Sequence, residues 1–259
     1  MYSEEFNKVA EISKVKAEFL KDNPVGYFIS SILAGIFVGI GVLLSFTSAA
    51  LVSGMPYQKI IMGATFGIAL SLVILAGSEL FTGNNLVMSA GNFTKKINIS
   101  STIKIWIVCF IGNWVGSILL ALLFINSGLA KGDTLELFNT ISVAKTTIPF
   151  SEILIRAILC NMLVCLAVWS SLKLKSESAK LIMIWWCLIA FIVIGFEHSI
   201  ANMTVLTIGI FNPDSAIELS GYMYNIFAVT LGNIIGGVGL VSLPYFIISK
   251  VKKGSYDGL

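Results

Sequence analysis

The sequence predicts an all-α integral membrane protein in which six transmembrane helices form a 3+3 inverted repeat with two broken helices. Three observations support this fold class. Of the 259 residues, 56% are hydrophobic and only 12% are charged, whereas a soluble domain carries about 25% charged residues. A polar motif occurs twice, each time inside a long apolar segment. Lysines are concentrated in alternate loops, as in proteins that cross a membrane several times.

The polar motif reads Gly-x-Glu-x4-Asn. Its two copies are Gly77, Glu79 and Asn84 in the first half of the chain and Gly195, Glu197 and Asn202 in the second. A charged residue at bilayer depth costs at least about 2.5–3.5 kcal/mol, so it is rarely placed there without a use. A second motif, Gly-Asn-x-x-Gly, places Asn113 and Asn233 at equivalent positions. The chain is therefore expected to contain two copies of one structural repeat.

The N-terminal segment, residues 3–22, is expected to form an amphipathic helix at the membrane surface. Its apolar residues recur every three to four positions, with Lys and Glu between them. Pro24 separates this helix from the first span, expected at about 25–50. That span contains Gly35 and Gly39, and small residues at this spacing are typical of close helix packing.

The two apolar segments that carry the polar motif, 60–93 and 180–211, each exceed thirty residues. A straight helix needs only about 20 residues to cross a bilayer. We therefore expect each segment to form two half-helices joined by non-helical backbone, which is tolerated only where protein or a water-filled cavity satisfies its polar groups. The other spans are expected at about 103–126, 148–172 and 222–249.

Lysine placement predicts the orientation in the membrane. Thirteen lysines lie at the two termini and in the loops after the second and fourth spans, whereas three lie in the alternate loops. The positive-inside rule therefore predicts that both termini lie in the cytoplasm. We expect a multi-pass protein of the plasma (inner) membrane. Because each repeat has three spans, the second copy crosses in the opposite direction, and broken helices in such repeats place the solute site near mid-membrane.

This pattern predicts a simple domain organisation. We expect an N-terminal amphipathic cytoplasmic helix over residues 1–23 and a short cytoplasmic tail over 251–259. A single six-helix channel domain is expected over 24–250, with the repeats at about 25–126 and 148–249.

His198 is the only histidine in the chain and lies in the predicted break of the second interrupted helix. A lone histidine is often a core residue, but this position favours a functional role. An imidazole with an unperturbed pKa of about 6.5 can donate a hydrogen bond to an anion or exchange a proton with it. Glu79 and Glu197 lie at equivalent positions beside Asn84 and Asn202, which favours a scaffold role for both carboxylates over a direct role in transport.

Arg156 lies early in the fourth span, four residues after Glu152 on the same helical face. A local ion pair between the two is expected, and a structural role is favoured over solute binding for this arginine.

Enzymatic and nucleic-acid-binding functions have no support. One histidine and four scattered cysteines do not make a metal-ligand set, no catalytic motif stands in the context it needs, and the basic loops lack interleaved aromatics. We expect no cofactor.

The polar motifs also carry a family resemblance. The segments GFEHSIANM at 195–203, ELFT at 79–82, NMLVCLAVW at 161–169 and GNIIGG at 232–237 resemble signature segments of the formate/nitrite transporter family. The resemblance covers essentially all six spans. It implies a homopentamer in the lipid bilayer whose protomers have an aquaporin-like helical fold. Each protomer would have its own pore for small monovalent anions such as formate, nitrite or hydrosulfide. Within the family, the sequence as a whole most resembles the hydrosulfide-channel branch.

The resemblance also implies roles for individual residues. His198 matches the central pore histidine and Thr82 its hydrogen-bond partner, which would fix the histidine tautomer. Lys145 matches the vestibule lysine that raises the local anion concentration. The hydrophobic constrictions correspond to Leu80 and Phe81 on the outer side and to Leu70 and Phe191 on the cytoplasmic side. Asn161, Glu197 and Asn202 match a polar set that braces the fifth helix, and the full structural polar network comprises Glu79, Asn84, Asn161, Glu197, Asn202 and Asn233.

Physical reasoning is consistent with an anion pore. Two apolar rings around a small cavity discourage hydrated cations and bare charge. A weak-acid anion lessens that cost by taking a proton, so transport linked to pH or to protons is expected. The alternative is a neutral small-solute channel of the aquaporin type. Such channels carry Asn-Pro-Ala at both breaks, whereas this chain has Gly-Asn-Asn at 83–85 and Ala-Asn-Met at 201–203, which disfavours that alternative.

Overall fold

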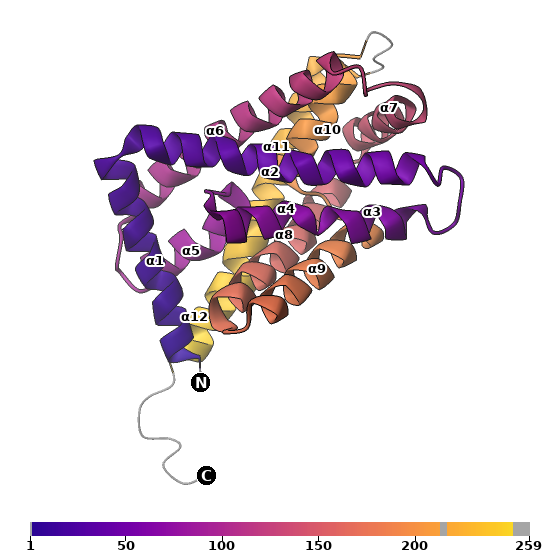
Figure 1. The fold of residues 1–259 in the computed structure, drawn as a ribbon. Helices are drawn as coiled ribbons and strands as arrows, with labels where there is room; N and C mark the ends of the chain where they lie inside the picture. The colour runs from indigo at the N-terminus through magenta and orange to yellow at the C-terminus, as the bar shows by residue number, and fades with distance from the viewer. Residues whose placement is uncertain (1, 213–216, 251–259) are drawn as a thin grey trace.

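The computed structural model describes residues 2–212 and 217–250, and the regular structure in these ranges is entirely helical (Figure 1). The first half comprises α1 (Ser3–Asp22), α2 (Pro24–Ala50), α3 (Gln58–Phe66), α4 (Ile68–Leu72), the π-helical turn η1 (Val73–Gly77), α5 (Phe81–Phe93) and α6 (Ile99–Asn126). The second half comprises α7 (Gly132–Thr147), α8 (Phe150–Lys173), α9 (Glu177–Ile194), α10 (Ser199–Ile210), α11 (Leu219–Ile235), the π-helical turn η2 (Gly236–Ser242) and α12 (Leu243–Ser249).

Six helical segments in the described ranges are long and apolar enough to cross a membrane. This confirms the predicted count of six spans, and both long apolar segments are interrupted where the polar motif lies. The amphipathic helix expected over 3–22 is present as α1. The tail expected over 251–259 lies outside the described residues.

One helix was not expected. Residues 132–147, which the sequence suggested as a loop carrying Lys145, form α7. Asp133 in its first turn and Lys145 in its last turn complement the helix dipole. The helix is anchored by Phe138, which is fully buried and stacks on Phe46 of α2 with ring centroids 4.2 Å apart. Phe138 is the only fully buried apolar side chain of α7, and its other large apolar residues are partly buried, so the sequence has no clear helical periodicity that would predict this helix.

The two repeats use the same close helix crossing. In the first repeat α2 packs on α6, and in the second α8 packs on α11. A Cβ added at Gly116 would lie 2.0 Å from the backbone oxygen of Ile32, and one added at the equivalent Gly236 would lie 2.1 Å from that of Ile158. Gly35, expected at a packed face, is equally confined by the backbone of Asn113. Only glycine lets these backbones approach so closely.

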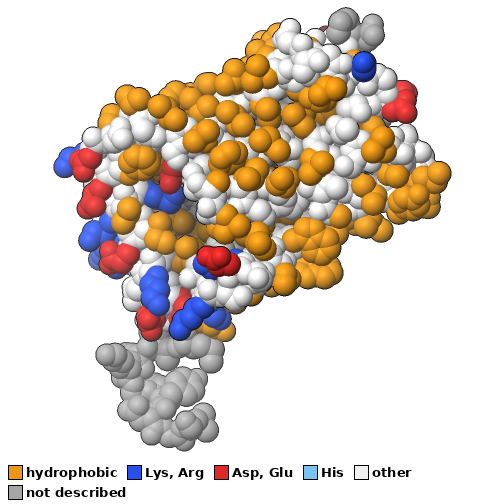
Figure 2. All heavy atoms as spheres, in the orientation of Figure 1, with side chains coloured by type: hydrophobic (Ala, Val, Ile, Leu, Met, Phe, Trp, Pro, Cys, Tyr) orange, Lys and Arg blue, Asp and Glu red, His pale blue; other side chains and the backbone are white. Residues whose placement is uncertain are grey.

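The outer surface matches a bilayer environment. Figure 2 shows hydrophobic side chains covering most of the visible face, while lysines and carboxylates gather at the end occupied by α1. Large exposed apolar residues follow α6 along its length, including Ile103, Ile107, Ile111, Leu119 and Leu123. An apolar band of this extent is expected on a protein that lies in lipid or packs against further subunits.

Both interrupted helices end at a glycine with left-handed backbone. Gly77 has φ 82° and Gly195 has φ 92°, a region that other residues adopt only with strain. The chain is then extended: Ser78 and Leu80 have β-region angles in the first break, as His198 has in the second. The next half-helices, α5 and α10, begin directly after these residues. The two breaks therefore share one backbone design.

Candidate functional site

An asparagine on α6 holds the backbone of the first break. Nδ2 of Asn113 donates to the backbone oxygens of Ser31 (2.7 Å) and Glu79 (2.8 Å). Its Oδ1 accepts from the backbone N–H of Phe81 at 2.9 Å. The side chain is fully buried, so these bonds satisfy backbone groups that no water would otherwise reach.

The second break is held in the same way by Asn233 on α11. Its Nδ2 donates to the backbone oxygens of Ala157 (2.8 Å) and Glu197 (3.0 Å), and its Oδ1 accepts from the N–H of Ser199 at 2.9 Å. The sequence repeat identified both asparagines but assigned only Asn233 to the polar network. The matching bonds show that Asn113 belongs to it equally.

The Glu79 carboxylate is the centre of a polar cluster beside the first break. Oε1 accepts from the ammonium of Lys16 on α1 at 2.5 Å, and Oε2 accepts from Tyr27 (2.9 Å) and Asn84 (3.0 Å). The side chains of Lys16 and Glu79 are only 17% and 11% exposed, so the charge pair is largely shielded from water. Through this pair α1 is fixed against the interrupted helix.

The Glu197 carboxylate has an equivalent cluster beside the second break. Lys145 on α7 donates to both carboxylate oxygens, at 2.9 and 2.8 Å, and Asn202 donates to Oε2 at 2.6 Å. Asn225 on α11 accepts from Asn202 at 2.9 Å. The side chains of Lys145 and Glu197 are 15% and 6% exposed. Lys145 is thus a paired cation on a helix, not the solvated loop lysine that the sequence alone would suggest.

His198 ends the second break and caps α10. Its Nδ1 accepts from the backbone N–H of Ala201 at 3.2 Å, the geometry of an N-cap side chain. Because Nδ1 is an acceptor, the neutral ring carries its proton on Nε2, and Nε2–H donates to Thr82 Oγ1 at 3.0 Å. The expected contact with Thr82 is present, but the tautomer is set by the backbone of Ala201 rather than by Thr82.

Three cavities lie along one path through the chain. The α7-side cavity, about 350 Å³, is bordered by Lys145 and His198, and the α1-side cavity, about 410 Å³, is bordered by Lys16 and Leu80. A narrow cavity of about 10 Å³ lies between them. It shares Phe66, Phe191 and His198 with the first and Leu70 and Leu80 with the second. This volume holds about one water molecule, so the path is constricted beside His198.

The structure places Leu70, Leu80 and Phe191 on the same narrow cavity, whereas two separate apolar constrictions were expected. Leu70 and Phe191, expected as one pair, both border this cavity. Phe191 also borders the α7-side cavity and stacks on His198 with ring centroids 6.0 Å apart, and Leu70 also borders the α1-side cavity. Phe81 borders none of the three cavities, because its ring packs on Phe110 and Trp106 of α6. As the first residue of α5, it is directed by the turn of the new helix away from the path.

Asn161 also lies differently from the expectation. It was assigned to a set that braces the fifth helix. Its Nδ2 instead donates to the backbone oxygens of Thr82 (3.3 Å) and Asn233 (2.6 Å). Asn161 therefore ties the start of α5 to α11 and holds the backbone of Thr82, the hydrogen-bond partner of His198. Sequence spacing could not predict this bond, because its partners are 79 and 72 residues away.

Three residues of the site were not singled out from the sequence: Lys16, Tyr27 and Asn225. Lys16 is one of four lysines in the N-terminal segment, and nothing local distinguishes it. Only the inverted repeat could have indicated Lys16, because a lysine that pairs with Glu197 implies an equivalent lysine that pairs with Glu79. The expected ion pair of Arg156 with Glu152 is present, with Nη2 donating to Oε2 at 2.9 Å.

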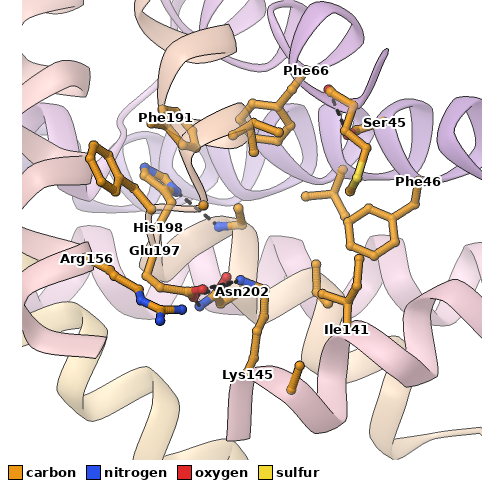
Figure 3. A pocket seen from close by; sticks show the side chains of 18 of the residues that line it. Ser45, Phe46, Phe66, Ile141, Lys145, Arg156, Phe191, Glu197, His198 and Asn202 are labelled. Atoms are coloured by element: carbon orange, nitrogen blue, oxygen red, sulfur yellow. Dashed lines mark hydrogen bonds and ion pairs between the residues drawn. The ribbon is translucent and has the colours of Figure 1, made fainter. Parts of the chain in front are cut away.

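Figure 3 shows Lys145, Glu197, His198 and Asn202 together at the α7-side cavity. With the six spans and the interrupted helices, this polar site defines a membrane transport protein. The formate/nitrite transporter family model matches residues 3–247. The nitrite transporter NirC of Escherichia coli is 41% identical over 249 residues, covering 95% of this chain and 92% of that protein. The formate channel BtFdhC of Bacillus thuringiensis is 36% identical over 226 residues, covering 83% of each chain.

Solved structures agree with these sequence matches. An FNT family ion channel superposes with a TM-score of 0.90 at 38% identity, covering 95% of this chain and 98% of its own. A pentameric formate channel with formate bound superposes with a TM-score of 0.78 at 28% identity, covering 88% and 98%. The chain belongs to the formate/nitrite transporter family, whose members are transporters and channels for small anions rather than enzymes. The aquaporin-type alternative is not favoured.

Proposed function

We propose that each protomer conducts small monovalent anions from the α7-side cavity, past His198, to the α1-side cavity. The single observation that carries this proposal is the position of His198, the hydrogen-bond partner of Thr82, at the one-water constriction between the two cavities. The apolar side chains of Phe191, Leu70 and Leu80 surround that constriction. They exclude hydrated cations, because no group there replaces the hydration shell.

Lys145 attracts the anion in this account. Its ammonium has three N–H donors, and two of them bond to the Glu197 carboxylate. The Glu197 carboxylate holds Lys145 in place and limits its net charge, so that an anion is attracted but can leave. Lys16 and Glu79 provide the equivalent arrangement in the α1-side cavity. Weak attraction at both ends is what conduction requires.

His198 donates its Nε2–H to the anion at the constriction, where the anion replaces Thr82 Oγ1 as the acceptor of that hydrogen bond. It can pass that proton on only if Nδ1 takes up another, which would break the bond from the Ala201 N–H. Hydrogen-bond donation is therefore its main role, and proton exchange, which would link transport to pH, is the secondary one. Thr82 acts through His198, because its hydroxyl is fully buried and borders none of the three cavities.

Formate and nitrite are the first anions to test, because relatives covering most of the chain are named for them. Hydrosulfide is the third candidate, since the overall look of the sequence is nearest that branch. We also propose a homopentamer in the plasma membrane, which is supported by the likeness to a pentameric formate channel. The division into an N-terminal helix (1–23), a channel domain (24–250) and a tail (251–259) is part of this proposal.

The experiment is anion flux in proteoliposomes with formate, nitrite and hydrosulfide, each at about pH 5 and pH 8, after subtraction of flux across protein-free vesicles. We expect saturable flux of at least one anion and a rate that rises at the lower pH, because a weak acid crosses the apolar constriction more easily when protonated. A chain that carries glycerol but none of the three anions would contradict the proposal.

Topology gives an independent test. The thirteen-to-three lysine asymmetry supports the proposal that both termini lie in the cytoplasm. Reporter domains fused at Lys95 or Lys175 are therefore expected to be cytoplasmic, and one fused at Lys131 extracellular. A cytoplasmic reporter at Lys131 would contradict the proposed orientation.

A further inference from the structure

Arg156 and Ser30 occupy equivalent positions in the two repeats. The backbone oxygen of Arg156 accepts from the N–H of Glu197 at 3.4 Å, and that of Ser30 accepts from the N–H of Glu79 at 3.3 Å. Each residue borders the cavity of its own half, Arg156 on the α7 side and Ser30 on the α1 side. The repeat thus places a guanidinium at one mouth of the path and a hydroxyl at the other.

This difference concerns only the side chains. The scaffold bond uses the backbone oxygen, so the guanidinium of Arg156 has no part in holding the break. The side chain is 42% exposed, and within residues 2–212 and 217–250 it makes one hydrogen bond, to Glu152. A guanidinium has five N–H donors. Most of them therefore remain available to a ligand.

The side chain of Arg156 points toward the proposed anion path. Figure 3 shows Arg156 and Lys145 reaching from different helices toward the same part of the α7-side cavity, near Glu197. Glu152, its helical neighbour, is not among the residues that line this cavity. The partner carboxylate therefore lies outside while the arginine borders the space inside.

The charged residues that border the α7-side cavity also favour a role for Arg156 in attracting anions. Three cations border it, Lys59, Lys145 and Arg156, together with one carboxylate, Glu197. Both oxygens of that carboxylate are bound by Lys145. Lys59 and Arg156 therefore add positive charge to this cavity beyond that of the Lys145–Glu197 pair. Clefts lined by charge of one sign raise the local concentration of the opposite ion.

We propose that Arg156 captures the anion in the α7-side cavity and gives this mouth a preference for planar anions with two oxygen atoms, as in formate and nitrite, over hydrosulfide. The guanidinium fork matches two oxygens with two parallel N–H donors, whereas a lysine offers a point charge. Hydrosulfide has a single acceptor atom and cannot form the two parallel bonds that the fork offers, so it gains less from the fork. This inference rests on the proposed function and names the anion class that the site selects.

The test compares Arg156→Ser, the residue of the equivalent position, and Arg156→Lys with the unaltered protein in proteoliposomes. The readout is the concentration of each anion that gives half-maximal flux. For Arg156→Ser we expect about a tenfold increase for formate and nitrite, from the loss of a charge-assisted hydrogen bond, and a smaller change for hydrosulfide. Arg156→Lys should restore hydrosulfide flux and leave formate and nitrite impaired.

Glu152→Gln is the matched control, because it breaks the same ion pair from the other side. If Arg156 captures anions, removing Glu152 lowers or leaves unchanged the half-maximal concentration. If the pair only stabilises α8, both substitutions impair flux alike, and that result would overturn the inference. So would wild-type values for Arg156→Ser in a protein that conducts formate. Failure of the unaltered protein to conduct any of the three anions would instead contradict the proposed function.

Discussion

Replacing Glu197 with Gln is expected to cause the largest loss of stability among single substitutions at the site. The substitution leaves the ammonium of Lys145, 15% exposed, without its carboxylate, and weakens the bond from Asn202. Removal of one partner from a buried pair costs about 3–5 kcal/mol. We expect about 3 kcal/mol, at the low end, because Lys145 borders a cavity that admits water. Thermal unfolding of the detergent-solubilised protein measures the effect, as a fall in Tm of about 6–12 °C.

Two variants make this measurement specific. Glu152→Gln removes a carboxylate from an exposed ion pair and should change stability by less than about 1 kcal/mol. The double substitution Lys145→Met with Glu197→Leu removes both charges and should recover much of the loss, because no unpaired charge remains. An unchanged Tm for Glu197→Gln would mean that the carboxylate does not hold the break.

Replacing His198 with Asn is expected to have the largest effect on transport. An asparagine side chain can still cap α10 by accepting from the Ala201 N–H, since Asn is among the best N-cap residues, so the fold should persist. The shorter amide does not reproduce the Nε2–H donor that faces Thr82 at the constriction. Hydrogen bonds to charged groups are worth about 1.5–3 kcal/mol, so the flux should fall by about tenfold or more.

The symmetry of the repeat separates scaffold from transport residues. Glu79 and Glu197, and likewise Asn113 and Asn233, make equivalent bonds in both halves. His198 has no such equivalent, because the corresponding position is Leu80. Symmetric polar residues therefore close the breaks, and residues that differ between the halves give the path its chemistry.

The sequence predicted the spans and breaks because both depend on local pattern. Apolar length, lysine distribution and the repeated Gly-x-Glu-x4-Asn motif are all visible without a structure. The ion pair between Arg156 and Glu152 was predictable for the same reason, since one helical turn separates the two residues. The contact between His198 and Thr82 followed from the family resemblance alone.

The remaining parts of the site depend on contacts between distant segments. Lys16 meets Glu79 across 63 residues because α1 lies against the first interrupted helix. The side chain of Phe81 turns toward α6, a direction fixed by the first turn of α5 rather than by its neighbours in sequence. The sequence could not show that Arg156 can bind a further ligand. That follows from the structure, in which Arg156 and Lys145 border the α7-side cavity and Glu152 does not.

The central claim is that anions pass His198. It is tested most directly by formate and nitrite flux through His198→Asn proteoliposomes at about pH 5 and pH 8, with Phe81→Leu as the control because Phe81 borders none of the three cavities. The account predicts reduced flux and an altered pH dependence for His198→Asn, and wild-type flux for Phe81→Leu. Wild-type flux of both anions at both pH values, in His198→Asn protein that assembles normally, would show that the histidine only packs the core.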